Sequence, residues 1–142
     1  MDSKNKYIII GVTVLIIVIL LFLYSNRNVE KTLICQKEDD IILSNNIEKH
    51  TFNGINNRIK TEDLEVNIYS DSQDLIDNYY DIISNNKECS DIDKGDKYII
   101  YKCHYDIENT NFYKEIKNED GELSFSDIKA MFEEDNYNCS YK

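Results

Sequence analysis

Residues 7–24 form an apolar stretch of 18 residues, YIIIGVTVLIIVILLFLY, without a charged side chain. At a rise of about 1.5 Å per residue, a helix of this length spans about 27 Å, close to the thickness of the hydrocarbon core of a bilayer. Tyr7 and Tyr24 stand at its ends, where tyrosine rings favour the level of the lipid headgroups. The stretch predicts one transmembrane helix, with the lipid bilayer as the first expected partner.

A cleaved secretory signal peptide is the alternative interpretation of this stretch. Signal peptides have a shorter apolar region, of about 7–15 residues, followed by a cleavage site with small residues. Here the polar segment Ser25-Asn26-Arg27-Asn28 follows the longer run. Cys35 lies well beyond the run and is preceded by Leu33-Ile34, which argues against a lipid-modified cysteine. The sequence therefore favours an uncleaved signal-anchor.

The direction of the helix is inferred from the cysteines. Basic residues flank both ends of the stretch about equally, so the positive-inside rule does not decide the orientation. All four cysteines follow the helix, and an even number in a small domain predicts disulfides formed outside the cytoplasm. We expect a single-pass protein of the cell membrane, with residues 1–6 as a cytoplasmic tail, residues 7–24 as the transmembrane helix, residues 25–31 as a spacer and residues 32–142 as the extracytoplasmic domain.

Four cysteines allow three pairings. We favour Cys89–Cys103, which joins the end of a helix to the next strand, together with Cys35–Cys139, which ties the first strand to the last residues. Four free thiols or a metal site in a cytoplasmic domain are the alternative interpretations. No C-x-x-C pair occurs, and the intervals of 54, 14 and 36 positions match no zinc-binding pattern.

The part of the chain after the apolar stretch is strongly acidic. Residues 25–142 contain 14 basic and 26 acidic residues, a net charge of −12. Nucleic acids and anionic lipid headgroups are bound through basic contacts, so we expect no nucleic-acid partner. An unidentified protein or another envelope component remains as the expected partner.

The pattern of apolar residues predicts an α+β domain. Residues 63–69 alternate, with Leu64, Val66 and Ile68 on one face, as in a half-buried strand. A helix capped by Ser70 is expected to follow, then a strand over residues 96–107. Strands in the first half and helices in the second favour a small antiparallel sheet covered on one face by two or three helices.

Three further local structures are expected. Asn53-Gly54 predicts a turn between strands. Thr110 can cap a short helix over residues 111–117, and Ser124 can cap a final amphipathic helix.

Residues 118–127, NEDGELSFSD, resemble the second half of an EF-hand calcium loop. The first ligand position of such a loop falls on Ile116, which offers no oxygen, and the last falls on Asp127 in place of the usual Glu. A polar turn followed by a capped helix explains the same residues. We predict no metal ligand and no cofactor, with a calcium-binding ectodomain as a less favoured alternative.

No catalytic residue is predicted, and we do not expect an enzyme. His50 and His104 are the only histidines, and no known motif surrounds either. An enzymatic ectodomain, the third alternative, would need a pocket that gathers acids such as Asp91 and Asp93 with His104.

The chain resembles a family of small, uncharacterised, membrane-anchored extracytoplasmic proteins of low-GC Gram-positive bacteria, similar in outline to YehR-like lipoproteins. The residues that carry this resemblance are Leu33-Ile34-Cys35-Gln36-Lys37 after the anchor and Tyr137-Asn138-Cys139 near the end. Asn136 stands where the family has Gly, and the lipoprotein signal is missing. The resemblance brings no established activity.

The leading hypothesis is a non-enzymatic extracytoplasmic binding module. A weaker resemblance, in size, topology and cysteine number, is to the small, disulfide-bonded, N-terminally anchored proteins of the poxvirus entry-fusion complex. A subunit of such a viral complex is the alternative function.

Overall fold

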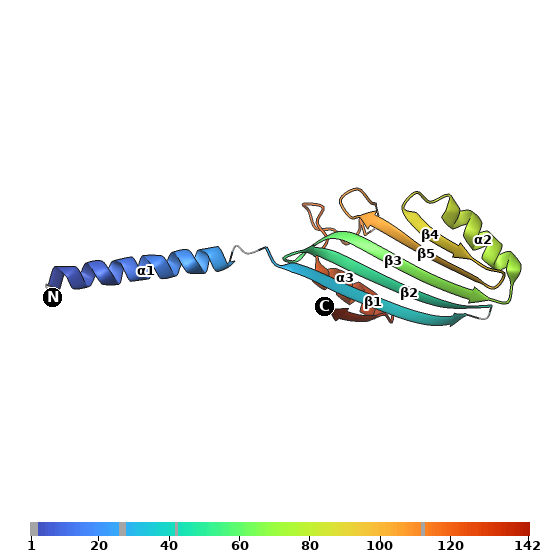
Figure 1. The fold of residues 1–142 in the computed structure, drawn as a ribbon, viewed down its shortest axis with the longest axis horizontal. Helices are drawn as coiled ribbons and strands as arrows, with labels where there is room; N and C mark the ends of the chain where they lie inside the picture. The colour runs from blue at the N-terminus through green and yellow to red at the C-terminus, as the bar shows by residue number, and fades with distance from the viewer. Residues whose placement is uncertain (1–2, 26–27, 42, 112) are drawn as a thin grey trace.

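The computed structural model describes residues 3–25, 28–41, 43–111 and 113–142, with the backbone alone for residues 3–12 and 41. These residues form three helices and six strands (Figure 1). In chain order these are α1 (Ser3–Ser25), β1 (Glu30–Ile41), β2 (Ser44–Ile55), β3 (Arg58–Ser70), α2 (Gln73–Ser84), β4 (Cys89–Lys94), β5 (Tyr98–Asp106), α3 (Phe125–Glu134) and β6 (Asn138–Tyr141).

The six strands form one antiparallel sheet in the order β4-β5-β3-β2-β1-β6. The three long strands β1, β2 and β3 are joined by tight connections and run side by side (Figure 1). This architecture confirms the predicted α+β class with an antiparallel sheet.

One face of the sheet is covered by α2 and α3, and both helices follow the expected amphipathic pattern. The apolar side of α3 packs on the β1 and β2 side, in a cluster with Leu33, Cys35 and Phe52. Helix α2 packs on the β3 and β5 side through Ile76, against Val66 and Ile99. The alternation predicted for residues 63–69 is therefore present, with its apolar side under α2.

The two disulfides fasten the two edge strands of the sheet. Cys35–Cys139 joins β1 to β6, and Cys89–Cys103 joins β4 to β5. In each pair the two residues lie directly opposite each other in the strand register. These are the two pairs favoured from the sequence. Because β4 and β6 are the shortest strands, covalent links compensate for their few backbone hydrogen bonds.

Helix α1 stands apart from the sheet (Figure 1). The described apolar side chains from Val14 to Tyr24 are about half exposed or more, between 49% and 73%. Among the described residues, no helix has the length and apolar character needed to cross a membrane. The expected span, residues 7–24, includes residues 7–12, whose side chains lie outside the described part of the chain.

The cap of α2 is Ser72, so the assignment to Ser70 is wrong. Ser70 is the last residue of β3, and its N–H donates to Lys97 O across 2.9 Å. The Ser72 hydroxyl accepts from Leu75 N and begins the helix. Two serines two positions apart have the same capping propensity, and only the length of β3 selects between them.

Asn53-Gly54 lies within β2, and the turn follows at residues 56–57, where Asn56 has a φ of 58°. A β-bulge at Asn53 and Gly54 brings the β3 backbone close, so that a Cβ on Gly54 would lie 1.9 Å from Arg58 O. The glycine is needed for this close approach and not for the turn.

The expected helix over residues 111–117 is absent from its described residues, which form a single turn with Ile116 N and Lys117 N donating to Tyr113 O. The structure also contains the edge strand β4, for which the sequence predicted no strand. This strand carries a bulge, with Asp91 at a φ of 49°, which breaks the alternation that would have marked it.

Candidate binding surfaces

The face of the sheet opposite the helices is polar. A row of cross-strand hydrogen bonds crosses it at one level: Thr32 Oγ1 donates to Asn53 Oδ1 at 2.9 Å, and Asn53 Nδ2 donates to Asp63 Oδ2 at 3.3 Å. The row ends at His104, whose Nδ1 lies 2.6 Å from Asp63 Oδ1. Both members of this last pair are about half exposed, so the pair contributes little to stability.

The residues named for a possible enzyme are only partly brought together. Asp91 and His104 line one shallow hollow on this polar face, together with Ser90 and Lys102. Asp93 lies elsewhere and accepts a long hydrogen bond of 3.4 Å from Tyr98 OH. Within the described chain no three His, Cys, Asp or Glu side chains are grouped to hold a metal ion.

The EF-hand-like segment forms a turn held by its own side chains. Asn118 Oδ1 accepts from Asp120 N at 3.0 Å and from Glu122 N at 2.8 Å. The Glu122 carboxylate pairs with Arg58 at 2.6 Å, and Ser124 caps α3 by accepting from Asp127 N. The side-chain oxygens of Asn118 and Ser124 therefore serve the turn and the cap.

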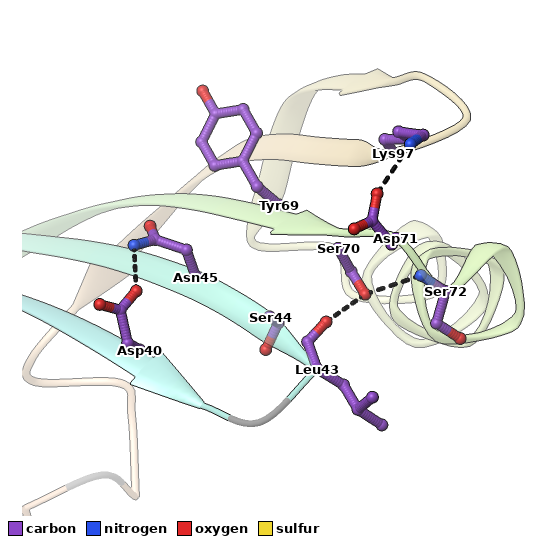
Figure 2. A pocket seen from close by; sticks show the side chains of 9 residues that line it. All are labelled: Asp40, Leu43, Ser44, Asn45, Tyr69, Ser70, Asp71, Ser72 and Lys97. Carbon is purple, nitrogen blue, oxygen red and sulfur yellow. Dashed lines mark hydrogen bonds and ion pairs between the residues drawn. The ribbon is translucent and has the colours of Figure 1, made fainter.

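An open hollow lies at the end of the sheet that points away from α1 in Figure 1, and Figure 2 shows the residues that line it. It is open, with a volume of about 680 Å³, and it is built from the β1–β2 connection, the end of β3 and the residue before β5. We call it the distal hollow. It is lined by Asp40, Leu43, Ser44, Asn45, Tyr69, Ser70, Asp71, Ser72 and Lys97.

Ser70 organises the floor of the distal hollow. Its hydroxyl donates to Leu43 O at 2.5 Å and accepts from Ser72 N at 3.0 Å, so one side chain links the hairpin connection to the start of α2 (Figure 2). The side chains of Leu43 and Tyr69 are 62% and 44% exposed. The hollow therefore offers a polar floor between two exposed apolar side chains.

The carboxylates around the distal hollow differ in whether a cationic side chain pairs with them. Asp71 pairs with Lys97 at 2.7 Å (Figure 2). Asp40 accepts from the neutral amide Asn45 Nδ2 at 2.6 Å, and the same amide donates to Glu38 at 3.3 Å. Among the described residues, neither the Asp40 nor the Glu38 carboxylate forms an ion pair, and the Asn45 amide is the side-chain donor that they share.

A second polar group is buried between the sheet and α3. His50 is 9% exposed and Glu62 is 2% exposed, and His50 Nδ1 lies 2.6 Å from Glu62 Oε1. Tyr113 OH donates to both Glu62 oxygens at 2.9 and 3.0 Å. On the other side of the ring, His50 Nε2 lies 3.7 Å from Glu48 Oε2, which accepts from Tyr137 OH at 2.6 Å.

The electrostatics of this group favour a charged imidazole. Burial lowers the pKa of His50, but the carboxylates of Glu48 and Glu62 outweigh burial and raise the pKa above its ordinary value. The nearby imidazole of His50 lowers the pKa of Glu48, and the hydrogen bond from Tyr137 OH acts in the same direction. Burial and the adjacent Glu62 carboxylate raise the pKa of Tyr113, so this tyrosine stays a donor. The group is a structural link, because its atoms face one another in the interior.

The sequence contained a signal for this buried group that the predictions missed. Alternate residues of a strand lie on the same face, so Glu62 shares a face of β3 with Leu64 and Val66. In the same way, His50 shares a face of β2 with Phe52. Polar residues at buried positions of two successive strands indicate a pair that meets in the interior of the domain.

Comparisons with known protein families, with curated proteins and with solved structures give no match to this chain.

Proposed function

We propose that this protein is a non-enzymatic binding module tethered to the cell membrane by residues 7–24, with residues 1–6 in the cytoplasm and the domain of residues 32–142 outside. The observation that carries the proposal is the direct succession of an uncharged apolar stretch and a domain with two disulfides. Disulfides persist in oxidising compartments, which favours a domain outside the cytoplasm. The apolar stretch before the domain is then the segment that crosses the membrane.

The arrangement of α1 supports a tether. Its described apolar side chains are exposed along the whole helix from Val14 to Tyr24 and do not belong to either core cluster. In water, so much contiguous apolar surface is unfavourable, whereas in a bilayer it is matched by lipid chains.

The position of the distal hollow supports binding at that end. The long strand β1 leaves α1 at one end of the sheet and reaches the distal hollow at the other (Figure 1). A domain held in this way presents the distal hollow away from the membrane, where a partner protein or another envelope component can reach it. Leu43 and Tyr69 supply apolar contact there.

Membrane attachment is tested by alkaline carbonate extraction of membranes from cells that produce the full chain. We expect the full chain to stay in the membrane pellet and a variant without residues 7–24 to be released. Protease added to the outside of intact cells or spheroplasts is expected to digest the domain and to spare a tag fused before residue 1. Release of the full chain by carbonate, or protection of the domain, would overturn the tether or its direction.

Binding is tested separately by site-specific photo-crosslinking in the native membrane. A photoreactive residue at Leu43 is expected to give a discrete adduct, whereas one at the exposed Glu115 serves as the matched control. Adducts of equal yield from both sites would argue against binding at the distal end.

A further inference from the structure

We infer that the outer edge of β1 from Lys37 to Asp40 binds an extended strand of a partner protein that carries basic side chains at alternate positions. The inference rests on the proposed binding function and specifies the partner.

Strand β6 covers only part of β1. Its four residues pair with positions 33–36, whereas β1 continues to Ile41. The remainder of β1 forms the free border of the sheet in Figure 1. Its pairing with β2 continues without a register shift through this part, so the free edge is regular.

The opposite edge of the sheet, formed by β4, is irregular. Strand β4 is interrupted by a register shift between Ser90 and Asp93, and Asp91 adopts a φ of 49°. A bulge of this kind twists an edge and disfavours pairing with another chain. The described sheet therefore has a regular edge segment with free backbone groups at positions 37–41 of β1, beyond the end of β6.

The backbone groups that face outward can be assigned. Thr32 O accepts from Lys142 N, so the even-numbered residues of β1 direct their N–H and C=O groups toward the β6 side. Beyond the end of β6, these residues are Glu38 and Asp40. Each offers one N–H donor and one C=O acceptor to an incoming strand.

The side chains at these same two positions define the charge of the partner. Glu38 and Asp40 lie on the polar face and share the neutral amide of Asn45 as their hydrogen-bond donor. On the other face Asp39 is paired with Lys37 at 2.8 Å. The hydrogen bond and charge of Asp39 raise the pKa of Lys37, and the carboxylate of Asp135 acts in the same direction.

An incoming strand places residues i and i+2 directly opposite Glu38 and Asp40. Lysine or arginine at both positions would pair with the carboxylates of Glu38 and Asp40, which have no cationic partner of their own among the described residues. The residue between them would lie on the other face, where Lys37 already pairs with Asp39. A second copy of this chain does not fit, because pairing the same edge with itself would bring Glu38, Asp39 and Asp40 of both copies together. The occupant is therefore a basic, alternating segment of a different protein.

The test uses the full chain in nanodiscs and a fluorescent peptide with alternating Lys and Val, with an alternating Glu and Val peptide as the control probe. Fluorescence anisotropy at low salt is expected to show binding of the Lys peptide alone. The double variant Glu38→Gln/Asp40→Asn is expected to bind about tenfold more weakly. The matched control Glu115→Gln/Glu119→Gln removes the same charge from the loop before α3 and is expected to bind as the wild type does.

A second variant separates backbone pairing from charge. Glu38→Pro removes the outward N–H at an edge position where proline is tolerated, and it is expected to abolish binding with the urea midpoint retained. Protection of the Glu38 and Asp40 amides from hydrogen exchange on peptide addition is the direct readout.

Three outcomes would overturn the inference: an equal loss of binding in the Glu115→Gln/Glu119→Gln control, unchanged binding by a folded Glu38→Pro protein, or concentration-dependent pairing of the chain with itself through β1. None of them bears on carbonate extraction or on crosslinking from Leu43, so failure here is distinct from failure of the proposed function.

Discussion

His50 Nδ1 lies 2.6 Å from Glu62 Oε1, and this contact joins two side chains that are both almost fully buried between the sheet and α3. The residues come from neighbouring strands, β2 and β3, and the ring is enclosed by Phe132 and Tyr137 at centroid distances of 4.7 and 5.4 Å. A buried ion pair enclosed in this way makes the stability of the domain depend on pH.

We predict that His50 stabilises the domain more at low pH than at high pH. The pKa of His50 is raised in the folded protein, so its stabilising contribution is fully present below the ordinary value of 6.5 and is lost as the pH rises through the folded pKa. The measurement compares urea midpoints of wild type and His50→Gln at about pH 6 and about pH 9.

The difference between the two proteins should be larger at the lower pH. Glu48, whose pKa is lowered, acts in the opposite direction only in the acid range, where its stabilising contribution is lost as the pH falls. A difference between wild type and His50→Gln that stays constant between the two pH values would contradict a charged His50.

Loss of the Tyr113 hydroxyl is expected to destabilise the domain by about 1.5–3 kcal/mol, the usual range for a hydrogen bond to a charged group. Tyr113 OH donates to both oxygens of the buried Glu62. Tyr113→Phe should therefore lower the urea midpoint, whereas Tyr69→Phe, at a tyrosine that is 44% exposed, should change it little. Equal effects of the two substitutions would show that the Glu62 contact is unimportant.

Two glycines give a matched test of backbone geometry. Gly121 has a φ of +74°, and a Cβ added there would meet no atom within 4 Å, so Gly121→Ala should cost about 1–2 kcal/mol for the left-handed conformation alone. Gly54→Ala places its Cβ 1.9 Å from a backbone oxygen and should cost more, because β2 or β3 has to shift. Thermal unfolding of both variants checks the order, and a smaller loss at Gly54 would contradict the bulge.

The two disulfides should differ in their contribution to stability. Chain entropy predicts about 3 kcal/mol for Cys89–Cys103, with a separation of 14 residues, and about 4.7 kcal/mol for Cys35–Cys139, with a separation of 104. The measurement is urea unfolding of the two double Cys→Ser variants. A larger loss from removing Cys89–Cys103 would show that strain or residual structure outweighs loop length here.

The elements with regular amphipathic patterns could be predicted from the sequence. Leu64, Val66 and Ile68 alternate, and α3 buries Phe125 and Ile128 on one side, so local periodicity was sufficient. The favoured disulfide pairs are also those of the structure: Cys89–Cys103 joins neighbouring elements of the chain, and Cys35–Cys139 joins the first strand to the last residues.

The buried polar group and the free edge of β1 depend on register, which local patterns do not contain. His50 and Glu62 meet only because β2 and β3 pair with a shift at the Gly54 bulge. Strand β4 is short and bulged, so its few residues carry no clear alternation. The length of β1 relative to β6, which leaves positions 37–41 free, is a property of the whole sheet.

The disulfide between Cys35 and Cys139 also sets an order of events during synthesis. Cys35 leaves the ribosome early, and its partner follows 104 residues later, after every other strand of the sheet. Until β6 arrives, all of β1 is an open edge beside an unpaired thiol. The growing chain is therefore exposed to wrong strand pairing and to mixed disulfides for most of its synthesis, and a chaperone or thiol oxidase acting during this interval would protect it.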